Sequence, residues 1–184
     1  MSTDNIAAFD ALLRDYDVVF GLVYRGHWCP FCLSHIRALK AIEERIHHAK
    51  GQTVIITSEM EENLPAVREA TGYKGPAIVD TENVLIKELV NRKIADVAIS
   101  SMPIRRYDHG MAQPAAFVMK GDGTVLFSWA IVPGLMNLGG AKDRPVLADV
   151  WDNAEAQLED RKVPHSTVTT TGVWSILSEK IWGV

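Results

Sequence analysis

The sequence predicts an α/β fold in which helices cover both faces of a mixed central sheet. Three short apolar runs of β type, VVFGLVY (18–24), TVIIT (53–57) and AIV (77–79), alternate with amphipathic segments of helical periodicity. A hairpin pattern and one more amphipathic segment follow them. Strands that alternate with helices are typical of a parallel sheet covered by helices, and the hairpin adds antiparallel strands to it.

Composition limits the classes of protein to be considered. The 184 residues suffice for one domain with a complete core, and 47% hydrophobic and 23% charged residues are ordinary for a globular protein. The net charge of −4 argues against nucleic acid as a partner, because phosphate binding needs a basic face. No apolar run approaches the roughly 20 residues of a membrane span, and the N-terminal sequence lacks the features of a signal peptide. We therefore expect a cytoplasmic protein without membrane contact.

The first predicted helix and strand lead to the two cysteines. The helix has a capping residue among residues 2–4, and the strand 18–24 runs directly into RGHWCPFCLSH (25–35). A long helix follows and ends near Gly51. The apolar face of the first helix is Ile6, Phe9, Leu12, Leu13 and Tyr16, and that of the long helix is Leu33, Ile36, Leu39, Ile42 and Ile46.

The middle of the chain predicts two further strand–helix steps. Pro65 suits the first turn of the helix after the strand 53–57. After the strand 77–79, the residues DTEN form a turn or cap before a helix over VLIKELV (84–90). From about 93 to 113 no periodicity is evident, and such a stretch inside a compact domain is usually functional or mobile.

The last third predicts a hairpin and two helices. AAFVM, the turn KGDG and TVLFSWAI form the hairpin over 115–131. Pro145 opens an amphipathic helix, and after Pro164 a Thr-rich linker leads to a short helix, VWSILSEKIW. We expect one domain over 1–163 and a linker with a C-terminal helix over 164–184. We expect that helix to pack on its own domain; as the alternative, two copies of the chain form a homodimer through it. The inward residues of the amphipathic helix are Leu147, Val150, Trp151, Ala154 and Leu158.

The cysteine motif lies where the first strand gives way to a helix, at the carboxyl end of a strand, where α/β folds place their sites. Residues three apart share a helical face, so Cys29 and Cys32 can form a disulfide. Unpaired amides and the helix dipole at the N-terminus stabilise a thiolate on Cys29, and Pro30 suits the first turn. Trp28 shields one side. We therefore predict a redox-active pair in which Cys29 is the nucleophile and Cys32 resolves it.

Two other interpretations of the pair remain open. His27, Cys29, Cys32 and His35 offer four zinc ligands within nine residues. Zinc sites normally take their second pair of ligands from a distant segment, and this chain has no second cysteine pair. Two inert thiols are the other alternative, because free cysteine is often simply buried. Redox chemistry is favoured over both, and we expect no metal.

VYRGHWCPFC after an apolar strand resembles the thioredoxin superfamily, in particular its peroxiredoxin-like branch of the alkyl hydroperoxide reductase/thiol-specific antioxidant type. EENLPAVREATGYKGPAIVDTENVLIKEL occupies the place of that branch's insertion between the cysteine helix and the closing hairpin, which QPAAFVMKGDGTVLF resembles. The resemblance covers about residues 5–160 and implies a three-layer thioredoxin-like fold. It also implies that Pro114 is a cis-proline facing the cysteines and that Gln113 contacts the substrate. Alternatively, Pro114 only marks the start of a strand.

Two positions depart from the pattern of peroxiredoxins. Their threonine three residues before the peroxidatic cysteine is Gly26 or Cys29 here, depending on which cysteine is aligned. Their arginine before the hairpin strand corresponds to Pro114. Arg25 and Arg105 are the candidates to supply a positive charge in its place.

These observations predict a thiol–disulfide oxidoreductase without a cofactor. Its substrate is a protein disulfide, glutathione or a peroxide, and its reductant is another protein or glutathione. Because the family's threonine and arginine are missing from the matching positions, we expect disulfide exchange to outrun peroxide reduction. A peroxide reductase is the alternative enzyme. A non-catalytic binding module is the alternative of another class, favoured slightly by Val23 in place of a buried thioredoxin aspartate.

Overall fold

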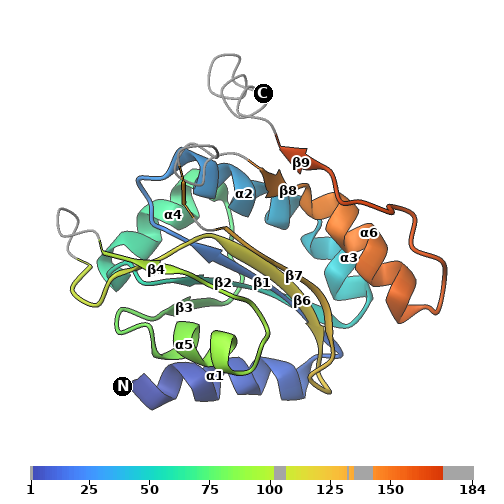
Figure 1. The fold of residues 1–184 in the computed structure, drawn as a ribbon, viewed down its shortest axis with the longest axis horizontal. Helices are drawn as coiled ribbons and strands as arrows, with labels where there is room; N and C mark the ends of the chain where they lie inside the picture. The colour runs from blue at the N-terminus through green and yellow to red at the C-terminus, as the bar shows by residue number, and fades with distance from the viewer. Residues whose placement is uncertain (1, 102–106, 132, 135–142, 172–184) are drawn as a thin grey trace.

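The computed structural model describes residues 2–101, 107–131, 133–134 and 143–171 and has the predicted mixed sheet at its centre (Figure 1). Its strand order is β3-β2-β1-β6-β7. The first three of these are parallel, whereas β6 runs antiparallel to both β1 and β7. The strands are β1 Val18–Tyr24, β2 Gly51–Thr57, β3 Ala77–Val79, β6 Ala115–Lys120 and β7 Val125–Ala130.

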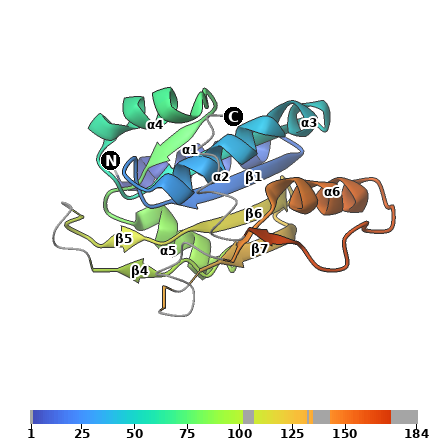
Figure 2. The ribbon, with the colours of Figure 1, turned by 90° about the horizontal axis from the view of Figure 1, so that it is seen from above.

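Helices cover both faces of the sheet, as predicted. α1 and α5 lie on one face, and α2, α3, α4 and α6 on the other (Figure 1). Figure 2 shows α4 over the β3 side of the sheet and α6 over the β6–β7 side, with α2 between them. The helices are α1 Ser2–Asp15, α2 Pro30–Ala41, α3 Glu43–His48, α4 Leu64–Thr71, α5 Val84–Asn91 and α6 Leu147–Leu158.

The central strand β1 explains why its sequence is apolar throughout. All seven of its residues are buried, because strands flank it on both edges and helices cover both faces. Successive side chains enter opposite cores: Phe20 joins the core under α2 and α6, and Val19 joins the core under α1 and α5. Gly21 lies opposite Phe117 in the register, where a Cβ atom would overlap the phenyl ring.

Three sequence-based expectations about helix boundaries are wrong. The long helix is divided between α2 and α3, because Ile42 (φ −105°, ψ 2°) leaves helical geometry while its N–H still bonds Leu39. The expected cap residues 2–4 already lie inside α1. Pro145 belongs to a short strand, and α6 begins two residues later at Leu147.

Short elements complete the described chain. β4 (Ile99–Ser100) pairs with β5 (Met111–Ala112) in the stretch without periodicity, and β8 (Arg144–Pro145) pairs with β9 (Thr170–Thr171). A 3₁₀ turn, η1 (Glu61–Asn63), precedes α4. None of the described helices is long and apolar enough to cross a membrane. The helix predicted over 173–182 lies outside the described residues, and the boundary at 163/164 stays a prediction.

Candidate functional site

The cysteine pair lies at the junction of β1 and α2, as the sequence predicts. Cys29 is the N-cap of α2, with extended backbone (φ −92°, ψ 103°), and Pro30 is the first helical residue. The Cys32 backbone N–H lies 3.3 Å from the Cys29 sulfur and points to it. The local sequence thus brings both sulfurs to the first turn of one helix.

Both thiols are free and nearly sealed from solvent. Cys29 is 2% exposed and Cys32 is fully buried, and both belong to the core under α2 and α6. The two side chains are hydrogen-bonded to each other. Only a small substrate can reach sulfurs buried to this degree without a wider opening of the site.

A buried arginine that the sequence analysis missed contacts this pair. Arg144 in β8 is 1% exposed, and its Nη2 lies 3.7 Å from the Cys32 sulfur. Its Nη1 donates to the Phe31 carbonyl at 3.2 Å. Arg144 is 112 residues away from Cys32 and belongs to no recognisable motif, so only the folded structure brings the two together.

The electrostatics of the pair contradict the expected order of acidity. Burial opposes ionisation of Cys32, but the Cys29 thiol, the charge of Arg144 and a backbone hydrogen bond from Arg25 together lower the Cys32 pKa to about 5. The Cys29 thiol donates to Cys32 and is itself buried, which raises the Cys29 pKa well above its usual range. In this arrangement the neighbouring cation and donors favour a thiolate on Cys32, against the expectation from the helix N-terminus.

Arg25 supplies a second cation, as the sequence analysis proposed. It follows β1 directly, hydrogen-bonds Cys29, and has its own pKa lowered by burial. Its Nε and Nη2 donate to the Gln113 side-chain oxygen at 2.9 and 2.7 Å. Gln113 is 1% exposed and its amide nitrogen donates to the Met111 carbonyl, so its side chain is held by the protein on both sides; a contact with the substrate stays a prediction.

The expectation of a cis-proline is wrong. No cis peptide bond occurs among the described residues, so the Gln113–Pro114 bond is trans. Pro114 is buried at the start of β6, and its carbonyl accepts from the Ile131 N–H. It thus fits the alternative interpretation, a proline that marks the start of a strand. Arg105, the other candidate cation, lies outside the described residues.

The side chains of Trp28, Tyr107 and Glu59 surround Gly26, the residue after Arg25. The Trp28 indole N–H donates to the Tyr107 hydroxyl at 3.1 Å, and that hydroxyl donates to the Arg25 carbonyl at 2.7 Å. A Cβ atom on Gly26 would lie 2.6–2.7 Å from Glu59 Oε1, Trp28 Nε1 and Tyr107 Oη. A threonine at this position, which one alignment with peroxiredoxins requires, therefore has no room.

The zinc interpretation finds no support in the arrangement of its histidines. His27 Nδ1 contacts Glu59 at 2.6 Å, and His35 Nε2 contacts the Pro145 carbonyl at 3.1 Å. Each ring thus has a protein partner away from the cysteines.

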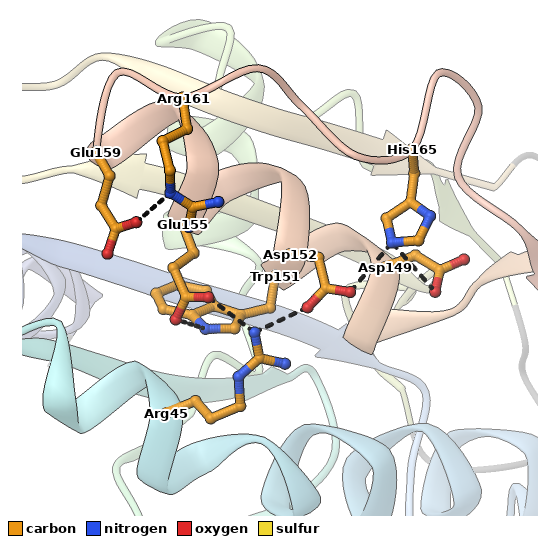
Figure 3. Close-up of polar contacts among 8 residues, drawn as sticks. All are labelled: Arg45, Asp149, Trp151, Asp152, Glu155, Glu159, Arg161 and His165. Atoms are coloured by element: carbon orange, nitrogen blue, oxygen red, sulfur yellow. Dashed lines mark hydrogen bonds and ion pairs between the residues drawn. The ribbon is translucent and has the colours of Figure 1, made fainter.

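Among the described residues, the one cluster with metal-ligand chemistry is Asp149, Asp152 and His165 (Figure 3). Its members already have protein partners. Asp152 pairs with Arg45 at 2.8 Å, and Asp149 accepts the Thr169 N–H. We therefore assign no metal function to it.

Comparisons with known proteins agree with this fold. No curated protein matches the chain significantly in sequence. Solved structures of similar fold include AhpC of Mycobacterium bovis (TM-score 0.61, 10% identity, 84% of this chain and 76% of that one). They also include a yeast mitochondrial 1-Cys peroxiredoxin (0.58, 15%, 83% and 68%) and AhpC of Enterococcus faecalis (0.57, 14%, 78% and 77%).

The fold is therefore the thioredoxin-like fold of peroxiredoxins, as the resemblance implied. The model of the AhpC/TSA family matches residues 5–128, which is more than half of the chain. This chain therefore belongs to the AhpC/TSA family and is an oxidoreductase of the peroxiredoxin class.

Proposed function

We propose that this chain reduces peroxides with the Cys29–Cys32 dithiol and ends each turnover as an intramolecular disulfide. One observation carries the proposal: a buried, hydrogen-bonded pair of thiols has two guanidinium groups beside it, Arg144 at Cys32 and Arg25 at Cys29. The cations stabilise a thiolate at neutral pH. They also offer donors to a peroxide oxygen as negative charge develops on it.

The proposed steps balance as follows. The Cys32 thiolate attacks one peroxide oxygen and the O–O bond breaks, giving a sulfenic acid while the leaving oxygen takes a proton from solvent and departs as water or an alcohol. The Cys29 sulfur then attacks the sulfenic sulfur. An S–S bond forms, the S–O bond breaks, and the hydroxide leaves with the Cys29 proton as water. An external thiol reductant returns both sulfurs to the reduced state.

This assignment reverses two expectations from the sequence. We take Cys32 as the attacking sulfur because its pKa is the lowered one, and Cys29 as the resolving sulfur. We also expect peroxide reduction to outrun disulfide exchange. Positive charge comes from Arg25, which the sequence analysis named as a candidate, and from Arg144, which it missed.

Thiol–disulfide exchange is the second candidate function. The position of Cys29 at the N-cap favours it, since that sulfur lies at the more exposed end of the pair. A protein disulfide is a bulky substrate, however, and it has little access to the Cys29 sulfur, because that residue is only 2% exposed. For the external reductant we propose glutathione, a small thiol and one of the two systems named for the yeast 1-Cys peroxiredoxin of similar fold; a thioredoxin-like protein, the other system, requires a wider opening of the site. A non-catalytic module would have no use for two cations placed on a dithiol.

The test is to add hydrogen peroxide to the reduced protein and follow both its consumption and the intact mass. We expect rapid loss of two hydrogen atoms from the wild type. Cys29→Ser should stop at a sulfenic acid on Cys32, which dimedone traps. Cys32→Ser should react slowly, as should the double variant that serves as the baseline.

A mixed disulfide given to the same reduced protein distinguishes the two candidates. A second-order constant for the disulfide that exceeds the peroxide constant would assign disulfide exchange as the main activity. A sulfenic acid trapped on Cys29 in Cys32→Ser, formed as fast as in the wild type, would reverse the roles of the two sulfurs.

A further inference from the structure

The side chain of His35 lies buried one helical turn after Cys32 and plays no part in the proposed chemistry. It is 6% exposed, and its ring packs edge-on against Trp129 with the ring centroids 6.2 Å apart. Its Nε2 lies 3.1 Å from the carbonyl oxygen of Pro145, the residue that follows Arg144 in β8.

The partners of the ring fix its tautomer. A carbonyl oxygen only accepts, so Nε2 carries the hydrogen and donates to Pro145. Nδ1 is then the bare nitrogen of a neutral imidazole, and it has no hydrogen-bond partner among the described residues.

His35 donates to the Pro145 carbonyl as a neutral ring, so it adds no charge beside Arg144. Burial, and then the charge of Arg144, lower the His35 pKa to about 3, although the bond to Pro145 acts in the opposite direction. Protonation would place a second buried cation near Arg144 and leave an N–H of Nδ1 without an acceptor. The ring therefore stays neutral at every pH at which the enzyme would work.

We propose that His35 is a positioning residue that holds β8 against α2 and thereby keeps the Arg144 guanidinium on the Cys32 sulfur. β8 contains only two residues, so a hydrogen bond to Pro145 acts one residue from the arginine. Cys32 and His35 lie three residues apart on one face of α2. The same helix therefore carries both the sulfur that Arg144 contacts and the ring that bonds Pro145.

The other support of β8 comes from the chain after α6. β9 pairs with β8, and the Val146 N–H donates to the Thr169 carbonyl at 2.8 Å. His165 anchors this chain to α6 through Asp152 at 3.1 Å (Figure 3). β9 thus holds β8 from the side of α6. On the side of the cysteine helix, the His35–Pro145 bond acts beside the bond from Arg144 to the Phe31 carbonyl.

The proposal rests on the proposed function only in taking Cys32 as the reacting sulfur, and its test needs no turnover. The readout is the pKa of the first thiol to ionise, followed by thiolate absorbance at 240 nm. His35→Phe keeps an aromatic ring against Trp129 but removes the donor. We expect its Cys32 pKa to rise by about 1 or more, which is about 1.4 kcal/mol, while His35→Gln, which restores an amide donor, should return it most of the way. His48→Phe changes an exposed histidine of α3 and serves as the matched control.

A double-mutant cycle separates positioning from mere packing. If His35 acts through Arg144, His35→Phe should leave the Cys32 pKa unchanged in an Arg144→Gln background. A His35→Phe variant that loses thermal stability but keeps the wild-type Cys32 pKa would overturn the proposal, as would an equal effect in both backgrounds. If the pKa responds as expected but peroxide does not react with any variant, the proposed function fails and the positioning role stands.

Discussion

Replacing Arg144 by glutamine tests the electrostatics of the site most directly. The charge lies 3.7 Å from the Cys32 sulfur, and both groups are buried. At an effective dielectric constant of about 20, two unit charges at this distance attract by about 4 kcal/mol. That energy corresponds to a pKa change of about 3. It is an upper limit, because the glutamine amide can still donate a hydrogen bond to the sulfur, and the contributions of the Cys29 thiol and the Arg25 backbone remain in the variant.

We therefore expect Arg144→Gln to raise the Cys32 pKa from about 5 by about 1 to 3, to between about 6 and 8. Thiolate absorbance at 240 nm between pH 4 and pH 10 measures this change. The rate of peroxide reduction at pH 7 should fall at least tenfold, since both the thiolate fraction and the stabilisation of the leaving oxygen decrease. Raising the pH to 9 should recover only the part that is due to the thiolate fraction.

Two controls isolate the effect of this one charge. Arg144→Lys retains the cation and should retain much of the lowered pKa. Arg37 is an exposed residue of α2, and its Nε donates to the Ala70 carbonyl. Arg37→Gln removes one positive charge there and should leave the Cys32 pKa unchanged. A Cys32 pKa that moves by less than about 0.5 in Arg144→Gln would refute the assignment of Arg144 as the stabilising charge.

Three further predictions follow from the same geometry. Gln113→Leu removes the Gln113 oxygen that accepts from Nε and Nη2 of Arg25. Stopped-flow fluorescence should then show peroxide reduction slowed by about fivefold or more, the result of losing about 1 kcal/mol; an unchanged rate would remove Arg25 from the mechanism. Gly26→Ala forces a Cβ atom against Glu59 and should lower the free energy of unfolding in urea by about 1–3 kcal/mol. An unchanged free energy of unfolding would show that the neighbouring side chains move aside at little cost. Because the Cys32 pKa is lower in the folded than in the unfolded state, its contribution to stability is complete above about pH 8.5 and is lost as the pH falls toward 5. The reduced wild type should therefore gain stability over Cys32→Ser between pH 5 and pH 8, and a difference that falls over this range would contradict the lowered pKa.

The architecture follows from local patterns in the sequence. The three parallel strands, the hairpin and the cysteine cap of α2 all depend on periodicity and capping within short segments. The long helix was wrongly predicted because the apolar period continues through Ile42 although the backbone turns there. A hydrophobic period reports which side chains face the core and does not report each backbone angle.

Most of the cysteine environment depends on contacts that no local pattern contains. Arg144 and Gln113 each reach the site from a distant segment. The spacing of residues along the sequence shows neither which charged groups meet nor how far apart they lie. The resemblance to thioredoxins led to Gln113 by a wrong argument, since Gln113 is buried behind Arg25 and its bond to Pro114 is trans. The one available signal for Arg144 was an arginine directly before a proline in a short segment without periodicity, and such arginines are usually exposed.

Chemistry, and not the position of a residue in the chain, explains how this site differs from the expected family pattern. A thiolate that attacks a peroxide needs nearby positive charge and donors, and the chain position of those groups does not matter. Here Gly26 leaves no room for a threonine, and a proline occupies the arginine position. In return, β8 brings Arg144 to Cys32, and the end of β1 brings Arg25 to Cys29. The same two groups explain why both sulfurs can be buried, because a buried thiolate is stable only beside a compensating charge.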